Sequence, residues 1–223
     1  MTRETLPAPL PPETRTVGQV VAEAIRLYGR RLWPSLPLGL PLAIADTLAI
    51  ATTTVEKILI LVVATPAFTL AFAWASAIAA DVRPRRSTWL RAFVLGTLAF
   101  LPAALFFPWF AILSVAWLAL VGLVVPVVMI EDAPFRRAWS RAIELCRADY
   151  VHAIGSLATL VIVFVLSRIA LAFLLREQAD NTIRVAVFVA DLFVSPLLFL
   201  GGALLYFDQA ARVDSGPRAE RRR

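Results

Sequence analysis

The stretch EDAPFRRAWSRAIELCRADY, residues 131–150, is the longest polar run between two hydrophobic blocks, and it decides how the chain is organised. Its apolar side chains recur at spacings of three and four: Phe135, Ala138, Trp139, Ala142 and Cys146. Charged side chains fall on the opposite side: Arg137, Arg141 and Glu144. This pattern predicts a basic amphipathic helix over 133–148, with Asp132 as its N-cap and Pro134 in its first turn. Because apolar blocks lie on both sides, we expect this helix on the cytoplasmic membrane surface, with its aromatic residues facing the acyl chains.

The composition predicts an all-α membrane protein. Of 223 residues, 60% are hydrophobic, and the mean hydropathy is +0.77. About half of a soluble domain is apolar, and roughly 20 apolar residues cross a bilayer. We predict a six-transmembrane helical bundle with cytoplasmic amphipathic interfacial helices. The expected spans are about 33–53, 58–80, 92–108, 111–130, 150–175 and 185–207, with a turn at Pro108 and Trp109, and the interfacial helices are 16–32 and 133–148.

Two tails flank this predicted membrane domain of residues 16–207. Residues 1–15 are rich in proline and lack the apolar core of a signal peptide, so we expect a disordered N-terminal tail. Residues 208–223 are expected to form a basic cytoplasmic tail.

The distribution of basic residues predicts the orientation. Nearly all arginines fall before the first expected span, in 81–91, in 131–150 or after residue 207, whereas the opposite loops hold only Lys57, Arg176 and Arg184. Positive charge favours the cytoplasmic side, so we expect a multi-pass protein of the plasma membrane with both termini cytoplasmic. The net charge of +6 then indicates contact with anionic inner-leaflet lipids rather than nucleic acid.

Three stretches carry a family resemblance: TVGQVVAEAIRLYGRRLW (16–33), PVVMIEDAPFRRAWSRAIELCRADY (126–150) and LLYFDQAARVDSG (204–216). Together they resemble the bacterial integral-membrane domain found attached to some glycerophosphodiester phosphodiesterases. The resemblance implies a multi-span helical domain whose role is mostly unassigned. The sequence holds no attached phosphodiesterase domain, so hydrolytic activity is not carried over.

The sequence offers little for catalysis. His152 is the only histidine and Cys146 the only cysteine, and no phosphate-binding glycine loop is present. We therefore expect no catalytic residue, cofactor or metal. Cys146 is interpreted as a buried bystander rather than a nucleophile, and His152 as an interfacial residue.

Three ionisable residues fall inside expected spans: Asp46, Arg168 and Asp191. Arg168 and Asp191 lie at similar distances from the loop around Asp180, so they should reach the same depth and form an ion pair. Asp46 is expected within a few ångströms of that depth. These charges either hold helices in register or form a substrate or proton pathway.

A second polar set lies at the ends of the fourth and sixth expected spans: Glu131, Arg137, Ser140, Tyr206, Asp208 and Arg212. We expect Glu131 and Asp208 to accept hydrogen bonds from Arg137 or Arg212. The set would then clamp the amphipathic helix to the bundle or, alternatively, contact lipid headgroups.

These features leave three functional hypotheses open. The first is a non-enzymatic scaffold or partner-binding module with a protein partner and a filled interior. The second is a small transporter or lipid-handling protein that uses Asp46, Arg168 and Asp191, and it requires a cavity that reaches Asp46 or Asp191. The third, a membrane enzyme, requires a nucleophile and base that converge.

Overall fold

The computed structural model describes residues 15–176 and 180–215, and this part of the chain contains helices and no strands. It confirms the all-α fold. Five helical segments are long and apolar enough to cross a membrane: Thr54–Ala80, Arg86–Phe106, Ala111–Glu131, Tyr150–Leu171 and Asn181–Asp214. Most of the predicted N-terminal tail and residues 216–223 of the predicted C-terminal tail lie outside the described residues.

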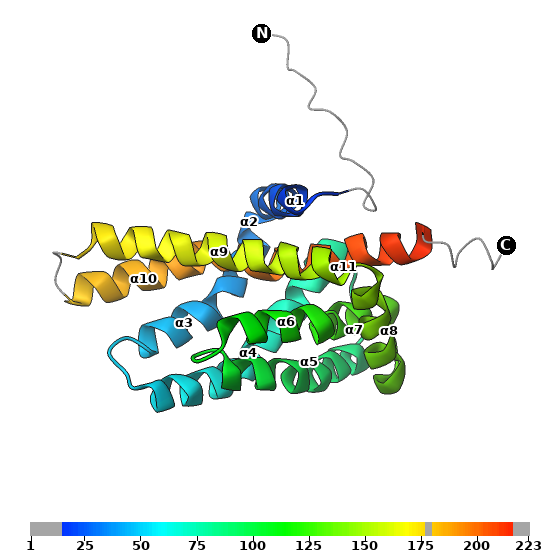
Figure 1. Cartoon of the computed structure of the whole chain (residues 1–223), viewed down its shortest axis with the longest axis horizontal. Helices are drawn as coiled ribbons and strands as arrows, with labels where there is room; N and C mark the ends of the chain where they lie inside the picture. Colours follow the sequence, from blue (N-terminus) through cyan, green and yellow to red (C-terminus); the bar gives the residue numbers. More distant parts are fainter. Residues whose placement is uncertain (1–14, 177–179, 216–223) are drawn as a thin grey trace, which may run out of the picture.

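One layer of the molecule consists of α4 (Thr54–Ala80), α5 (Arg86–Phe106), α6 (Ala111–Val121) and α7 (Val124–Glu131), as Figure 1 shows. α4 packs along α5, and both contact α7. Small side chains permit this close packing, because Ala71, Ala75 and Ala99 at the contact are almost completely buried. The turn predicted at Pro108 and Trp109 is present between α5 and α6.

The second layer is formed by α9 (Tyr150–Leu174), α10 (Asp180–Val194) and α11 (Pro196–Ser215). α10 and α11 follow one another along the length of α9, with a break at Ser195 (Figure 1). α1 (Val17–Arg30) lies across α9 and α11. The last expected span was 185–207, but α11 remains helical to Ser215, so residues 208–215 belong to the bundle rather than to a tail.

The amphipathic helix at the centre of the sequence is α8 (Phe135–Ala148). Its apolar face is buried against α6, α7 and α11 through Ala138, Ala142, Leu145 and Cys146, whereas Phe135 remains 49% exposed. Most of the apolar face therefore packs on protein, and the expectation that the aromatic residues face acyl chains stays a prediction.

Asp132 does not cap α8. It terminates α7 in a left-handed conformation with φ of 52°, and Pro134 occupies the N-cap position of α8. The Asp132 carboxylate instead accepts hydrogen bonds of 2.5 Å from Thr88 and Arg91 of α5. The hydrogen bond from the Thr88 hydroxyl is the main cause that lowers the pKa of Asp132, and Arg91 contributes in the same direction.

The first expected span, 33–53, is interrupted. Its residues are divided among α2 (Leu32–Ser35), the 3-10 helix η2 (Leu36–Gly39) and α3 (Leu40–Leu48). The physical reason is proline: Pro37 and Pro41 cannot donate the backbone hydrogen bonds that a continuous α-helix needs. None of the three pieces is long enough to be a candidate span by itself.

Gly39, at the end of η2, brings α3 close to α10. A Cβ atom at Gly39 would lie 2.2 Å from the carbonyl oxygen of Leu192, so no larger residue fits without displacing one backbone from the other. Ser195, where α10 ends, donates its hydroxyl to the carbonyl oxygen of Asp191 at 2.6 Å and lies 3.4 Å from that of Gly39. Two interrupted helical segments therefore meet at one point of the bundle.

Candidate functional site

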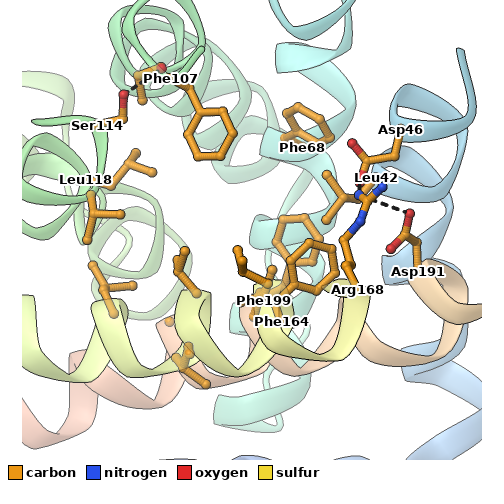
Figure 2. A pocket seen from close by; sticks show the side chains of 18 of the residues that line it. Leu42, Asp46, Phe68, Phe107, Ser114, Leu118, Phe164, Arg168, Asp191 and Phe199 are labelled. Atoms are coloured by element: carbon orange, nitrogen blue, oxygen red, sulfur yellow. Dashed lines mark hydrogen bonds and ion pairs between the residues drawn. The ribbon is translucent and has the colours of Figure 1, made fainter. Parts of the chain in front are cut away.

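The three charges that were expected inside membrane spans lie together, on three different helices. Arg168 on α9 pairs with Asp46 on α3, and its Nη1 atom lies 3.5 Å from Oδ2 of Asp191 on α10 (Figure 2). The predicted pair of Arg168 and Asp191 is present. Asp46 was expected only at a similar depth, and it is the closer partner of the guanidinium.

The contact between α3 and α10 positions the two carboxylates. Asp46 is seven residues beyond Gly39, and Asp191 immediately precedes Leu192, whose carbonyl oxygen faces Gly39. Arg168 reaches both acids from α9. Its Cζ atom lies 5.8 Å from the centre of the Phe164 ring. The aromatic face adds a favourable interaction with the guanidinium.

The three side chains differ in exposure. Asp191 is 1% exposed, Asp46 20% and Arg168 32%. Oδ2 of Asp191 is buried and has no hydrogen-bond partner among the described residues. A buried acceptor without a donor costs about 1–3 kcal/mol, and more when it is charged. This atom is consequently the least satisfied part of the site.

A cavity of about 650 Å³ extends from the charge cluster between the two layers. In Figure 2, Asp46, Arg168 and Asp191 lie at one side of this space, and Phe107, Ser114 and Leu118 lie at the other. Nearly all of the remaining lining residues are aliphatic or aromatic. Sites for small molecules typically enclose roughly 300–1,000 Å³ with apolar walls and a few polar groups, so the cavity has the dimensions of a ligand site.

The second predicted set contains a clamp with different partners. Glu131 accepts hydrogen bonds from the Tyr206 hydroxyl at 2.8 Å and from Arg141 Nε at 3.3 Å. We expected Arg137 in place of Arg141. Arg137 and Ser140 are exposed on α8, where the Ser140 hydroxyl donates to the Arg137 carbonyl at 3.1 Å. The clamp thus joins α7, α8 and α11 without these two side chains.

Asp208 and Arg212 join a separate network. The two oxygens of Asp208 lie 3.4 Å from Arg15 Nη1 and 3.4 Å from His152 Nε2. Arg212 donates to Asp149 at 2.9 Å and to the Arg15 carbonyl at 3.0 Å, and its positive charge also acts on the Asp208 carboxylate. These contacts tie the start of α9 and the segment before α1 to α11.

Sequence reasoning missed Arg15, Arg141 and Asp149 in these networks. Each is an ordinary charged residue near a helix end, and its partner is set by how distant helices cross. His152 was expected at the membrane interface. It lies in the first turn of α9, where its Nε2 atom faces Asp208. No local spacing signal could have found these pairs.

Cys146 is completely buried, and its Sγ atom lies 2.6 Å from the carbonyl oxygen of Ala119. Burial raises the pKa of this thiol to about 11, which keeps it protonated and unreactive at neutral pH. This geometry agrees with the interpretation of Cys146 as a buried bystander. Within the described residues, no group of three or more His, Cys, Asp or Glu side chains is arranged to hold a metal ion.

Fold and site together define a helical protein with five candidate membrane spans and an apolar cavity that ends in charged groups. No family model, curated protein or solved structure matches the chain. The resemblance to the membrane domain of glycerophosphodiester phosphodiesterases therefore stays a prediction.

Proposed function

We propose that this chain is a non-enzymatic, multi-pass membrane protein of the small-transporter or lipid-handling kind, which holds a ligand with a hydrocarbon chain inside the bundle. The observation that carries the proposal is the cavity of about 650 Å³ that reaches Asp46, Arg168 and Asp191. A hydrocarbon chain suits its apolar walls, and a polar end suits the three charges.

The alternative that the sequence favoured, a scaffold or partner-binding module, calls for a filled interior. A cavity of this size, partly open to the outside, argues against it, because the space between the two layers is not filled by side chains. A scaffold would also gain nothing from three charged side chains placed beside open space, since each charge is costly in an apolar environment.

The interrupted helices give further support. Transporters commonly build their binding sites where transmembrane helices are broken, because the unpaired backbone groups and nearby side chains can then bind a substrate. Here the breaks in η2 and at Ser195 meet beside Asp191, and Asp46 follows on α3. The charge cluster therefore lies where a transporter would place its site.

The proposal includes six crossings, with the interrupted segment α2–η2–α3 as the first. The arginine-rich loop before α5, α8 and the end of α11 lie at one end of the molecule in Figure 1. We place this end in the cytoplasm of a plasma membrane, where arginines contact anionic lipids. The family resemblance supports the same multi-span architecture.

Reporter fusions test the orientation. A reporter that is active only in the cytoplasm should be active when fused after Arg86 or after Arg147, and inactive when fused after Arg176. Activity after Arg176, or inactivity at either of the other two positions, would contradict six crossings with cytoplasmic termini.

Photo-crosslinking in lipid nanodiscs tests the cavity. The probe is dodecanol with a diazirine near the end of its chain, and mass spectrometry locates the crosslinks. We expect crosslinks at cavity residues such as Val115 and Phe199, in addition to those on the lipid-facing surface.

A matched pair of variants on α6 sharpens this test. Leu118→Trp fills part of the cavity and should remove the cavity crosslinks, whereas Leu113→Trp changes a residue that is 54% exposed and outside the cavity lining. Crosslinks confined to the outer surface in the wild-type protein, or cavity crosslinks that persist in Leu118→Trp, would refute the proposed ligand site.

A further inference from the structure

The charges along the cavity are unequal in sign. Among the described residues that line it, the charged ones are two carboxylates, Asp46 and Asp191, and one guanidinium, Arg168. When both acids are ionised, the cluster carries one net negative charge. Electrostatic attraction and repulsion are strong in such a poorly solvated place, so the sign of this charge selects the ligand.

The hydrogen bonding of Asp191 also favours a ligand with a hydrogen-bond donor and a positive charge. Oδ2 of Asp191 is buried beside the cavity, and its one partner among the described residues is the 3.5 Å ion pair with Arg168, with no hydrogen bond; an ionised carboxylate can only accept hydrogen bonds. A ligand that completes this site must therefore donate. A carboxylate or phosphate head would instead add a third negative group beside one guanidinium, which already faces both acids.

The apolar walls of the cavity favour a ligand whose remaining part is apolar. Ser114 contributes the only side-chain hydroxyl among the described lining residues, and this hydroxyl already donates to the carbonyl oxygen of Ala103 at 3.0 Å. The far wall therefore offers few polar groups to a second head. A hydrocarbon chain that extends from the charges toward Leu118 would meet mainly aliphatic and aromatic side chains (Figure 2).

We infer that the cavity binds a cationic amphiphile, with a primary ammonium head between Asp46 and Asp191 and a hydrocarbon chain along the apolar walls. This inference rests on the proposed function and specifies the substrate class of the same site. An ammonium group has three N–H donors and one positive charge, so it supplies the missing hydrogen bond and neutralises the cluster. Arg168 keeps the two carboxylates apart and oriented.

Competition against the diazirine-bearing dodecanol measures the preference for the head. The competitors are dodecylamine, dodecanol and dodecanoate at about pH 8, where the amine is protonated and the acid ionised. We expect dodecylamine to halve the cavity crosslinks at a concentration at least about tenfold below that of dodecanoate, with dodecanol between them. Crosslinks on the lipid-facing surface serve as the internal control for general effects of the amphiphiles.

Isosteric variants assign the preference to the two acids. Asp46→Asn and Asp191→Asn each remove one negative charge and should abolish most of the difference between amine and carboxylate. The double variant, which leaves Arg168 alone, should prefer dodecanoate. Asp81→Asn is the control, because Asp81 is 79% exposed and does not line the cavity. If one single variant fails to fold, the other provides the same measurement.

A lysophosphatidylethanolamine competitor tests whether the head must carry a net positive charge. Its phosphate brings a negative group beside the ammonium, so it should compete more weakly than dodecylamine; competition as strong as that of dodecylamine would contradict the preference for a cationic head. Equal competition by dodecylamine and dodecanoate in the wild-type protein would overturn it, as would a preference that persists in both single variants. These results would leave the cavity site itself intact, whereas an absence of cavity crosslinks would refute the proposed function.

Discussion

Two buried aspartates of the second layer, Asp191 and Asp208, have the same exposure and very different surroundings. Each side chain is 1% exposed and lies beside an arginine. Both oxygens of Asp208 have a partner, in Arg15 and in His152, and the residue does not line the cavity. Among the described residues, Oδ2 of Asp191 has only the 3.5 Å ion pair with Arg168 and no hydrogen bond, and Asp191 borders about 650 Å³ of open space. Burial of a charge alone therefore does not mark a ligand site; an unmet hydrogen bond beside open space does.

The largest expected effect compares these two residues directly. Asp208→Asn should lower the free energy of unfolding by about 3 kcal/mol, because it removes the buried negative charge that faces both Arg15 and His152. Asp191→Asn should cost about 1 kcal/mol or less, since it removes a poorly satisfied charge and Arg168 keeps Asp46 as its partner. Both free energies of unfolding can be measured in mixed micelles by raising the concentration of a denaturing detergent and following the loss of helix by circular dichroism. Equal losses would show that the two aspartates have the same structural role.

A smaller effect tests whether the clamp at Glu131 is structural. Tyr206→Phe removes the 2.8 Å hydrogen bond to the Glu131 carboxylate and should lower the free energy of unfolding by about 1.5 kcal/mol, a typical value for a bond to a charged group. Cavity crosslinking should not change.

Tyr150→Phe is the matched control for that variant. The Tyr150 hydroxyl also donates a hydrogen bond, to the Ala116 carbonyl at 3.0 Å, but its acceptor is neutral and the bond is exposed. Its loss should cost about 0.5 kcal/mol. A loss for Tyr206→Phe no larger than that for Tyr150→Phe would contradict a structural clamp.

Hydropathy and turn chemistry predicted much of the fold. Long apolar runs located α4, α5 and α9, and Pro108 with Trp109 located the turn between α5 and α6. The apolar run at 33–53 predicted one unbroken span, but a hydropathy window does not register the change from α-helix to 3-10 helix at Leu36–Gly39 or the end of α3 at Leu48. The predicted end of the last span, residue 207, was also too early, because hydropathy does not detect polar helical turns. The last turns of α11 are polar, and they remain helical because they pack on α1 and α8.

The candidate site was predicted in part. Equal distances from one loop placed Arg168 and Asp191 at the same depth, and this argument needs only the rise of a helix. The cavity was beyond such reasoning, because its volume depends on how closely the two layers pack along their whole length. The exchange of Arg137 for Arg141 at Glu131 shows the same limit. The two arginines lie one turn apart on the same face of α8, so a small shift along the helix axis decides which of them reaches the acid.

The combined length of α10 and α11 has a consequence for how they fit a membrane. The candidate span Asn181–Asp214 contains 34 residues, which at about 1.5 Å per residue extends roughly 50 Å. A hydrocarbon core is only about 30 Å thick, so this segment must tilt or project from the bilayer. Asp208 and Gln209, both fully buried in protein, lie in its last turns, where projection toward the headgroups costs least. If the segment crosses the bilayer as proposed, a thinner membrane should favour greater tilt of α10 and α11.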